Sequence, residues 1–300
     1  MKKSENILII KHGALGDLIQ AVGIIKSIRY EHINAELVLL TSKKFINLMS
    51  MCPYIDDQLI DNRSSFLNIF SLIHLYKNIK KYNFKIIYDL QNSQRTYIYR
   101  KYLFKKINWV TTDRKDHPIS GLRGLEEMLR EYLVISKDIF RPDISWLAID
   151  TKNIIKKNKI LSKYIVLLPG SSKKNPLKRW PYFVDLAKLL ISKGYEVITI
   201  LGPEELEMNR SFPGHILKNL DWSQLSGIIK NSYFVVGNDS GPSHIASCLN
   251  KKGLALFGPS TSAVRSELKR GKFEILKVDN LENLAADEVL GVMIKILNKN

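Results

Sequence analysis

The chain has 300 residues, of which 45% are hydrophobic and 25% charged, and its formal net charge is +17. These values exclude a disordered chain, a collagen-like repeat and a small disulfide-stapled domain, and the length suffices for two ordinary domains. Both halves of the chain carry the excess of Lys and Arg. The charge therefore predicts anionic partners: nucleotide phosphates, nucleic acid or an anionic membrane face.

The sequence shows no sign of a disulfide framework, a zinc site or a membrane span. Its two cysteines, Cys52 and Cys248, are too few for a framework, and no Cys and His spacing is typical of zinc ligands. The first apolar run, 7–10, is too short for the core of a signal peptide, and no run approaches the ~20 apolar residues of a membrane span. We expect a soluble protein of the reducing cytosol that can rest on a membrane surface.

Apolar runs of strand length alternate with segments of helical period in the first half. Strands are predicted at 7–10, 36–41, 85–90 and 107–111, and helices at 17–30, 65–81, 94–104 and 122–134. Residues 139–163 lack a clear period, and we place a linker there. The first half therefore predicts a parallel sheet with helices on both faces.

The alternation resumes after the linker. Strands are predicted at 164–168, 196–201, 233–237 and 253–257, and helices at 181–193, 221–231, 242–250 and 281–297. The fold class is therefore α/β, with two doubly wound Rossmann-like domains at 1–150 and 151–300 and a cleft between the carboxyl ends of their sheets. We expect that the last helix can pack back on the first domain.

The first loop whose residues could carry a chemical function, 11–17, joins the first strand to the first helix. Gly13 and Gly16 allow a tight turn and a close approach of the backbone to a ligand. Asp17 has two interpretations: an N-cap of the helix, or a functional carboxylate. The loop is not the dinucleotide fingerprint, because no acidic residue ends the second strand, and the chain has no phosphate-binding P-loop.

The second loop, 168–181, follows the first strand of the second half and favours a diphosphate ligand. It contains the hydroxyls of Ser171 and Ser172, four cations that include Lys178, and a tryptophan. Hydroxyls and amides bind phosphate oxygens, and lysines neutralise their charge. The alternative is a solvated basic loop.

The third loop, 236–244, opens a helix with Pro242 near its first position, where free amide groups form an anion site. Asp239 and Ser240 alternatively serve only as helix caps, and His244 alternatively packs in the core. A fourth loop, 256–261, again follows a strand, and alone it is weak evidence.

Together these loops resemble the bacterial lipopolysaccharide heptosyltransferases of glycosyltransferase family nine. The matching stretches are ILIIKHGALGD, LLPGSSKKNPLKRWP, VVGNDSGPSHIAS and LALFGPST, and the resemblance runs through both halves. It implies the GT-B architecture, with the acceptor on the first domain and the nucleotide-sugar on the second. It also implies transfer of a heptose from ADP-heptose to a lipopolysaccharide inner-core acceptor, with inversion, at the cytoplasmic face of the inner membrane.

The resemblance also assigns roles to residues. It implies that Asp17 is the general base, in a loop where Gly13 and Gly16 adjoin the acceptor. The donor-binding residues it implies are Ser171, Ser172, Lys178, Asp239, Ser240, Gly241 and His244. An acidic residue after the second strand of the donor domain often contacts the nucleotide ribose in the family, and here Glu204 or Glu205 fills that place.

The expected acceptor side is inferred from residues 89–104 themselves, outside the matching stretches. Gln91 and Arg95 follow a strand of the first half and are expected to face the acceptor, and the following helix mixes basic and aromatic side chains. Such a helix suits an anionic acceptor in the membrane plane, and the alternative is a solvated helix with a packed aromatic face.

The sequence departs from the family pattern in two places, and it indicates a reaction without a metal. Ser replaces a common Thr in the donor hydroxyl pair, and no Asp follows the fourth loop closely. No D-x-D motif occurs, so we expect no metal and no cofactor. Lys178 and the helix start at Gly241 are expected to stabilise the leaving diphosphate instead.

Three other functions stay open at this point. A GT-B enzyme that uses a UDP- or GDP-linked sugar fits the same loops. A nucleic-acid-binding protein fits the charge, but no clustered reading motif is present, and we expect no nucleic-acid partner. A silent sugar-nucleotide-binding protein fits less well, because Asp17 and Lys178 are both present.

Overall fold

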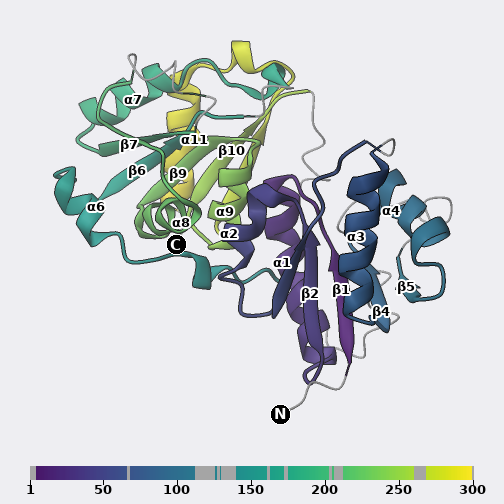
Figure 1. Ribbon diagram of the computed structural model, residues 1–300. Helices are drawn as coiled ribbons and strands as arrows, with labels where there is room; N and C mark the ends of the chain where they lie inside the picture. The colour runs from purple at the N-terminus through teal and green to yellow at the C-terminus, as the bar shows by residue number, and fades with distance from the viewer. Residues whose placement is uncertain are drawn as a thin grey trace. The chain divides into compact units, whose positions relative to one another are not determined.

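The computed structural model describes residues 5–65, 68–111, 126, 129, 140–160, 163–171, 175–202, 205, 212–259 and 268–298. The chain divides into two compact units, residues 1–146 and 147–300, and the division falls inside the linker predicted at 139–163 (Figure 1). The helix predicted at 122–134 lies outside the described residues except for Glu126 and Leu129. In the described part of the chain, no helix has the length and apolarity needed to cross a membrane.

The first unit is built on a five-stranded parallel sheet of order β3-β2-β1-β4-β5. Its strands are β1 (Asn6–Ile10), β2 (Glu36–Thr41), β3 (Asp57–Ile60), β4 (Ile86–Asp89) and β5 (Asn108–Val110). Its helices are α1 (Leu15–Glu31), α2 (Ile46–Met49), α3 (Ile69–Lys81) and α4 (Gln94–Ile98), with short 3₁₀ turns at Lys43–Phe45 and Ser145–Leu147. The sheet confirms the predicted α/β class, and β3 is a strand that the sequence analysis did not predict.

Both faces of this sheet are buried because its strands are apolar on both sides. Leu8 and Ile10 pack in one core with Leu75 and Ile79 of α3. The alternate residues Ile7 and Ile9 point to the opposite face, and they too are fully buried. Continuous apolar strands of this kind are typical of doubly wound sheets.

The helix predicted at 94–104 is not regular. It begins as α4 and widens at Tyr99–Leu103 into a π-turn, in which the amide of Phe104 donates to the carbonyl oxygen of Tyr99 at 2.9 Å. Tyr99 and Phe104 both belong to the core that α3 covers, and Tyr76 of α3 stacks on Phe104. An α-helix would turn residues five apart away from one another, whereas the wider π-turn keeps both rings on the buried face.

The second unit is built on a six-stranded parallel sheet of order β11-β10-β9-β6-β7-β8. Its strands are β6 (Tyr164–Leu168), β7 (Glu196–Leu201), β8 (His215–Lys218), β9 (Phe234–Asn238), β10 (Gly253–Phe257) and β11 (Phe273–Lys277). Its helices are α6 (Lys152–Lys157), α7 (Phe183–Ser192), α8 (Trp222–Asn231), α9 (Gly241–Cys248) and α11 (Ala286–Leu297), with 3₁₀ turns at Pro176–Lys178 and Leu281–Asn283. Read from β6, the strands follow the doubly wound Rossmann order.

The last helix, α11, lies beside α7 in the core of the second unit (Figure 1). Its buried residues Val289, Leu290 and Met293 pack in the same cluster as Phe183 and Leu186 of α7. The apolar face of this helix is thus used within the second unit. The expectation that it also packs on the first domain stays a prediction.

Each sheet has one point where the strand order reverses, between β1 and β4 in the first unit and between β6 and β9 in the second. Connections leave such a point toward opposite faces, and the crevice outside the carboxyl ends of the strands is where ligands bind in open α/β sheets. The predicted loops 11–17 and 89–95 follow β1 and β4, and the loops 168–181 and 236–244 follow β6 and β9. The fold therefore places each pair of loops at a switch point.

Candidate functional site

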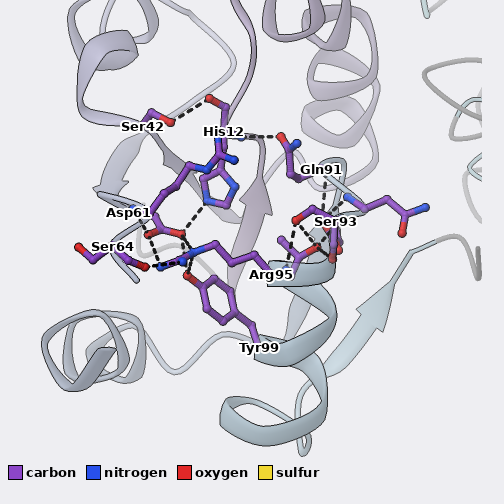
Figure 2. Close-up of polar contacts among 12 residues, drawn as sticks. His12, Ser42, Asp61, Ser64, Gln91, Ser93, Arg95 and Tyr99 are labelled. Carbon is purple, nitrogen blue, oxygen red and sulfur yellow. Dashed lines mark hydrogen bonds and ion pairs between the residues drawn. The ribbon is translucent and has the colours of Figure 1, made fainter. Parts of the chain in front are cut away.

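The loop after β1 is held from three sides at His12 (Figure 2). The amide of His12 donates to Oε1 of Gln91 at 3.0 Å, and its carbonyl oxygen accepts from the hydroxyl of Ser42 at 3.0 Å. Its imidazole Nε2 lies 3.0 Å from Oδ2 of Asp61. Each of these three partners follows a different strand, so the loop is fixed by its neighbours at the carboxyl edge of the sheet.

Asp17 is exposed in the first turn of α1, as its third residue. The N-cap position belongs to Ala14, which makes no side-chain capping bond, so the N-cap interpretation of Asp17 is wrong. The loop turns at Gly13, whose φ of 79° lies in the left-handed region, and the helix begins two residues later. Asp17 is therefore an accessible carboxylate at the positive end of a helix dipole.

Arg95, which we expected to bind the acceptor, is occupied within the first unit. Its Nε and Nη2 donate to the two carboxylate oxygens of Asp61 at 3.1 and 3.2 Å, and its Nη1 donates to the carbonyl oxygen of Ser64 at 2.7 Å (Figure 2). Tyr99 also donates its hydroxyl to Asp61, at 2.7 Å. The guanidinium therefore organises the strand ends, and Gln91 faces the loop of His12.

The carboxyl of Asp61 is only 3% exposed, and its environment keeps it ionised. Burial alone would raise its pKa, but contacts from His12, Tyr99 and Arg95 together hold the pKa well below the usual range. Asp89, at the end of β4, differs, because burial raises its pKa despite hydrogen bonds from Thr96 and from the amides of Asn92 and Gln91. The two acids at this edge of the sheet are therefore not equivalent.

In the second unit, the end of β9 lies beside the donor loop. Nζ of Lys178 donates to Oδ2 of Asp239 at 2.7 Å, and Nε2 of His244 lies 3.9 Å from Oδ1 of the same carboxylate. Asp239 and His244 are both buried. The structure thus brings together three of the predicted donor-binding residues at the start of α9.

No side chain caps the start of that helix. Ser240 is the N-cap but makes no side-chain capping bond, and Gly241 and Pro242 are the first two helical residues. The hydroxyl of Ser243 donates to the carbonyl oxygen of Asn238 at 2.6 Å and so fixes the turn. The arrangement agrees with an anion site at the N-terminus of α9.

A second cluster holds the beginning of the donor loop. Nε and Nη2 of Arg179 donate to the side-chain and carbonyl oxygens of Ser171 at 3.2 and 3.0 Å, and Nη2 lies 3.5 Å from Oε1 of Glu205. Gly170 leaves space for that carboxylate, since a Cβ there would lie 2.9 Å from Cδ of Glu205. Ser172 and Glu204, and residues 260–261 of the fourth loop, lie outside the described residues.

Sequence reasoning missed four residues that organise these sites: His12, Asp61, Arg179 and Asn238. The side chain of Asn238 joins both ends of the donor loop to β9, because it donates to the carbonyl oxygen of Pro169 at 2.8 Å and accepts from the amide of Trp180 at 3.0 Å. His12, Arg179 and Asn238 lie inside the quoted motifs but carried no distinguishing signal. Asp61 follows an edge strand that has no apolar run.

Among the described residues, no group of three or more His, Cys, Asp or Glu side chains has an arrangement suited to a metal ion. The two cysteines are free thiols, one in each unit. Burial raises the pKa of both Cys52 and Cys248 to about 12, so neither is an activated nucleophile. The accessible chemistry of the described residues is that of carboxylates, cations and amides.

Comparison with known proteins matches the sequence to a family of enzymes. The family model of glycosyltransferase family 9 (heptosyltransferase) matches residues 128–280. Lipopolysaccharide heptosyltransferase 1 of Campylobacter coli is 24% identical over 322 aligned positions, which cover 93% of this chain and 92% of the relative.

Two solved structures share the fold over nearly their whole length. A glycosyl transferase of family 9 from Veillonella parvula superposes with a TM-score of 0.83 at 16% identity, covering 100% of this chain and 99% of that one. The Escherichia coli heptosyltransferase WaaC, solved with ADP-2-deoxy-2-fluoro heptose, has a TM-score of 0.75 at 16% identity, with 97% and 99% covered. These likenesses confirm the expected GT-B fold class with two Rossmann-like domains.

Proposed function

The chain belongs to glycosyltransferase family 9, the heptosyltransferases, and on that premise we propose that it transfers a heptose from ADP-heptose to a lipopolysaccharide inner-core acceptor. The proposed reaction inverts the anomeric centre and needs no metal. The WaaC relative, which was solved with an ADP-linked fluoro-heptose, supports the choice of donor.

The observation that carries the proposal is the cluster of Lys178 and Asp239 at the start of α9. Asp239 orients the ammonium group of Lys178 through a 2.7 Å hydrogen bond, beside the amides of a helix N-terminus. As the glycosidic bond breaks, negative charge grows on the leaving diphosphate. A fixed cation and fixed amides stabilise that charge without reorganisation, which lowers the barrier to transfer.

The remaining donor roles follow from the same loops. We assign the diphosphate to Ser171, Ser172, Lys178, Ser240 and Gly241, with His244 supporting Asp239. Of the two acids considered for the ribose, we favour Glu205, because Arg179 joins its carboxylate to Ser171. Glu204 is the alternative.

We assign the acceptor to the first unit and the base to Asp17. Its carboxylate is exposed at the start of α1, beside Gly13 and Gly16, where an acceptor hydroxyl has access. Asp17 takes the proton of that hydroxyl as its oxygen attacks the anomeric carbon. The bond to the diphosphate breaks on the opposite face, so ADP leaves and the configuration inverts.

The location of the reaction is also part of the proposal. We place the enzyme at the cytoplasmic face of the inner membrane, where a lipid-anchored inner-core acceptor would be presented. The net charge of +17 supports contact with anionic lipid head groups and with the phosphates and carboxylates of such an acceptor.

The experiment is transfer from ADP-heptose to heptose-free lipopolysaccharide, with ADP binding measured by calorimetry. Asp17→Asn cannot take a proton, so kcat should fall by about 10²–10⁴-fold while ADP affinity stays unchanged. Lys178→Gln keeps a donor for Asp239 but loses the charge, so it should weaken ADP binding and lower kcat together. Wild-type activity should persist in EDTA.

Three outcomes would contradict parts of the proposal. A folded Asp17→Asn variant with the wild-type rate would remove the base assignment. Tighter binding of UDP or GDP than of ADP would favour another nucleotide-sugar. Loss of activity in EDTA that Mg²⁺ or Mn²⁺ restores would show that transfer requires a metal.

A further inference from the structure

The polar contacts at the carboxyl edge of the first sheet converge on Asp61 (Figure 2). Asp61 follows β3 directly, and its carboxylate meets His12 from the loop after β1 and Arg95 and Tyr99 from the segment after β4. In the sheet, β2 and β1 lie between β3 and β4. One carboxylate at an edge strand therefore joins three strand ends on both sides of the switch point.

Stability alone does not explain a buried charge at this place. Removing a carboxylate from water is costly, and its ion pairs repay that cost only partly, so apolar residues often hold elements together as well. The apolar core that contains Leu8, Ile10 and Ile87, with Leu59 of β3 packed against it, already joins these strands. A carboxylate adds direction, because it accepts from Arg95 and Tyr99 at fixed positions while His12 lies within 3.0 Å of it.

The direction of these contacts matters because His12 lies just before the helix that contains Asp17. Only Gly13 separates His12 from the N-cap Ala14, and a Cβ at Gly13 would lie 2.7 Å from the ring of Phe45, so a larger residue does not fit at this connection unless that ring shifts. Asp17 stands three residues after the N-cap, in the first turn. The contact between His12 and Asp61 therefore fixes the point from which the helix of Asp17 begins.

We propose that Asp61 is a positioning residue for glycosyl transfer: through His12 it holds the helix start that carries Asp17, and through Arg95 it ties that start to the segment after β4. The inference rests on the proposed function, because it takes Asp17 as the base. Asp61 itself is buried and touches no substrate in this role.

A double-mutant cycle tests the inference, with wild type, Asp17→Asn, Asp61→Asn and the double variant assayed for transfer from ADP-heptose to heptose-free lipopolysaccharide. Asp61→Asn should lower kcat by about 10- to 100-fold, because small misplacements of a reacting group carry costs of that order. ADP affinity should not change. In the Asp17→Asn background, the same substitution should change kcat by less than about 2-fold, since coupled residues are non-additive.

Asp57→Asn is the matched control, because Asp57 is an exposed carboxylate at the start of β3, the strand that Asp61 follows. The kcat of this variant should equal that of the wild type. The inference would be overturned if Asp61→Asn had the wild-type kcat, or if it lowered kcat equally in the wild-type and Asp17→Asn backgrounds. Either result would leave the assignment of Asp17 as the base intact. A wild-type rate for Asp17→Asn would instead overturn the base assignment, and this inference with it.

His12→Gln provides a second route if Asp61→Asn does not fold, because it disrupts the same contact and leaves the Asp61–Arg95 pair in place. It should lower kcat without changing ADP affinity. Hydrogen exchange of the amides at 12–17 should become faster in this variant, while peptides of the second unit stay unchanged. Unchanged exchange at 12–17 together with a wild-type kcat would overturn the inference.

Discussion

At the scale of single residues, several charged side chains in and after the strand ends are paired within their own units. Asp61 pairs with Arg95, Lys178 with Asp239, and Arg179 with Glu205. When one member of such a pair is removed, the other charge is left without a partner in a largely buried place. The fold then loses more stability than the pair contributes. Substitutions at these sites should therefore keep a hydrogen-bonding side chain, as Lys178→Gln and Asp61→Asn do.

The depressed pKa of Asp61 predicts how its contribution to stability depends on pH. A carboxyl whose pKa is lower in the folded than in the unfolded state stabilises the fold above the unfolded value, about 4, and loses that contribution as the pH falls further. The wild type should exceed Asp61→Asn in free energy of unfolding at neutral pH. In urea unfolding, the difference should narrow as the pH falls from about 4 toward 2. A difference that stays constant over that range would contradict the prediction.

At the scale of elements, close packing decides where helices lie. In α1, a Cβ added at Gly23 would lie 1.9 Å from the carbonyl oxygen of Phe140 and 2.9 Å from the amide nitrogen of Pro142. Both contacts are with backbone atoms, which do not move aside as a flexible side chain does. Gly23 therefore allows the segment at 140–142 to lie directly against the helix.

Gly23→Ala should lower the free energy of unfolding by about 1–3 kcal/mol, the usual cost of overpacking. Gly291→Ala in α11 is the control, because no atom lies within 4 Å of a Cβ there. Alanine is the better helix former, so this control should raise stability by up to about 1 kcal/mol. Thermal or urea unfolding measures both, and equal effects of the two substitutions would contradict the packing argument.

At the scale of the whole molecule, the positive charge is the main guide to partners. On the segment after β4, Nζ of Lys101 lies 5.2 Å from the ring centre of Tyr102, and the side chains of Tyr97 and Tyr102 are both exposed. Exposed aromatic rings beside cations suit the interface of an anionic bilayer. This surface is where we expect peripheral contact with lipid.

The enzyme should therefore sediment with vesicles that contain anionic phospholipid, and not with vesicles of phosphatidylcholine alone. Binding should weaken as salt rises, because the screening length falls to about 3 Å at 1 M ionic strength. Lys101→Glu together with Tyr102→Ser should reduce binding, while ADP affinity stays unchanged. Salt-independent sedimentation would contradict an electrostatic contact.

Much of the fold was predictable from the sequence. The interior strands β1, β2, β6, β9 and β10 are continuous apolar runs, because both faces of a doubly wound sheet are buried. The strands that the sequence did not predict, β3, β8 and β11, all lie at sheet edges. These three edge strands are partly exposed and have only short apolar runs, so their pattern does not differ from that of a loop, whereas the edge strand β5 was predicted. The π-turn after α4 was missed because only packing requires it.

The sequence by itself determined the α/β class, the two-unit plan and the loops that carry the chemistry, since each of these depends on a local pattern of apolar runs, glycines and charged residues. Only the tertiary structure decided which of those residues meet. In the structure Lys178 pairs with Asp239, Arg95 pairs with Asp61, and the N-cap of α1 is Ala14 rather than Asp17. These pairings join residues 34 and 61 positions apart, and a contact over such a separation depends on strand order, which no local pattern encodes.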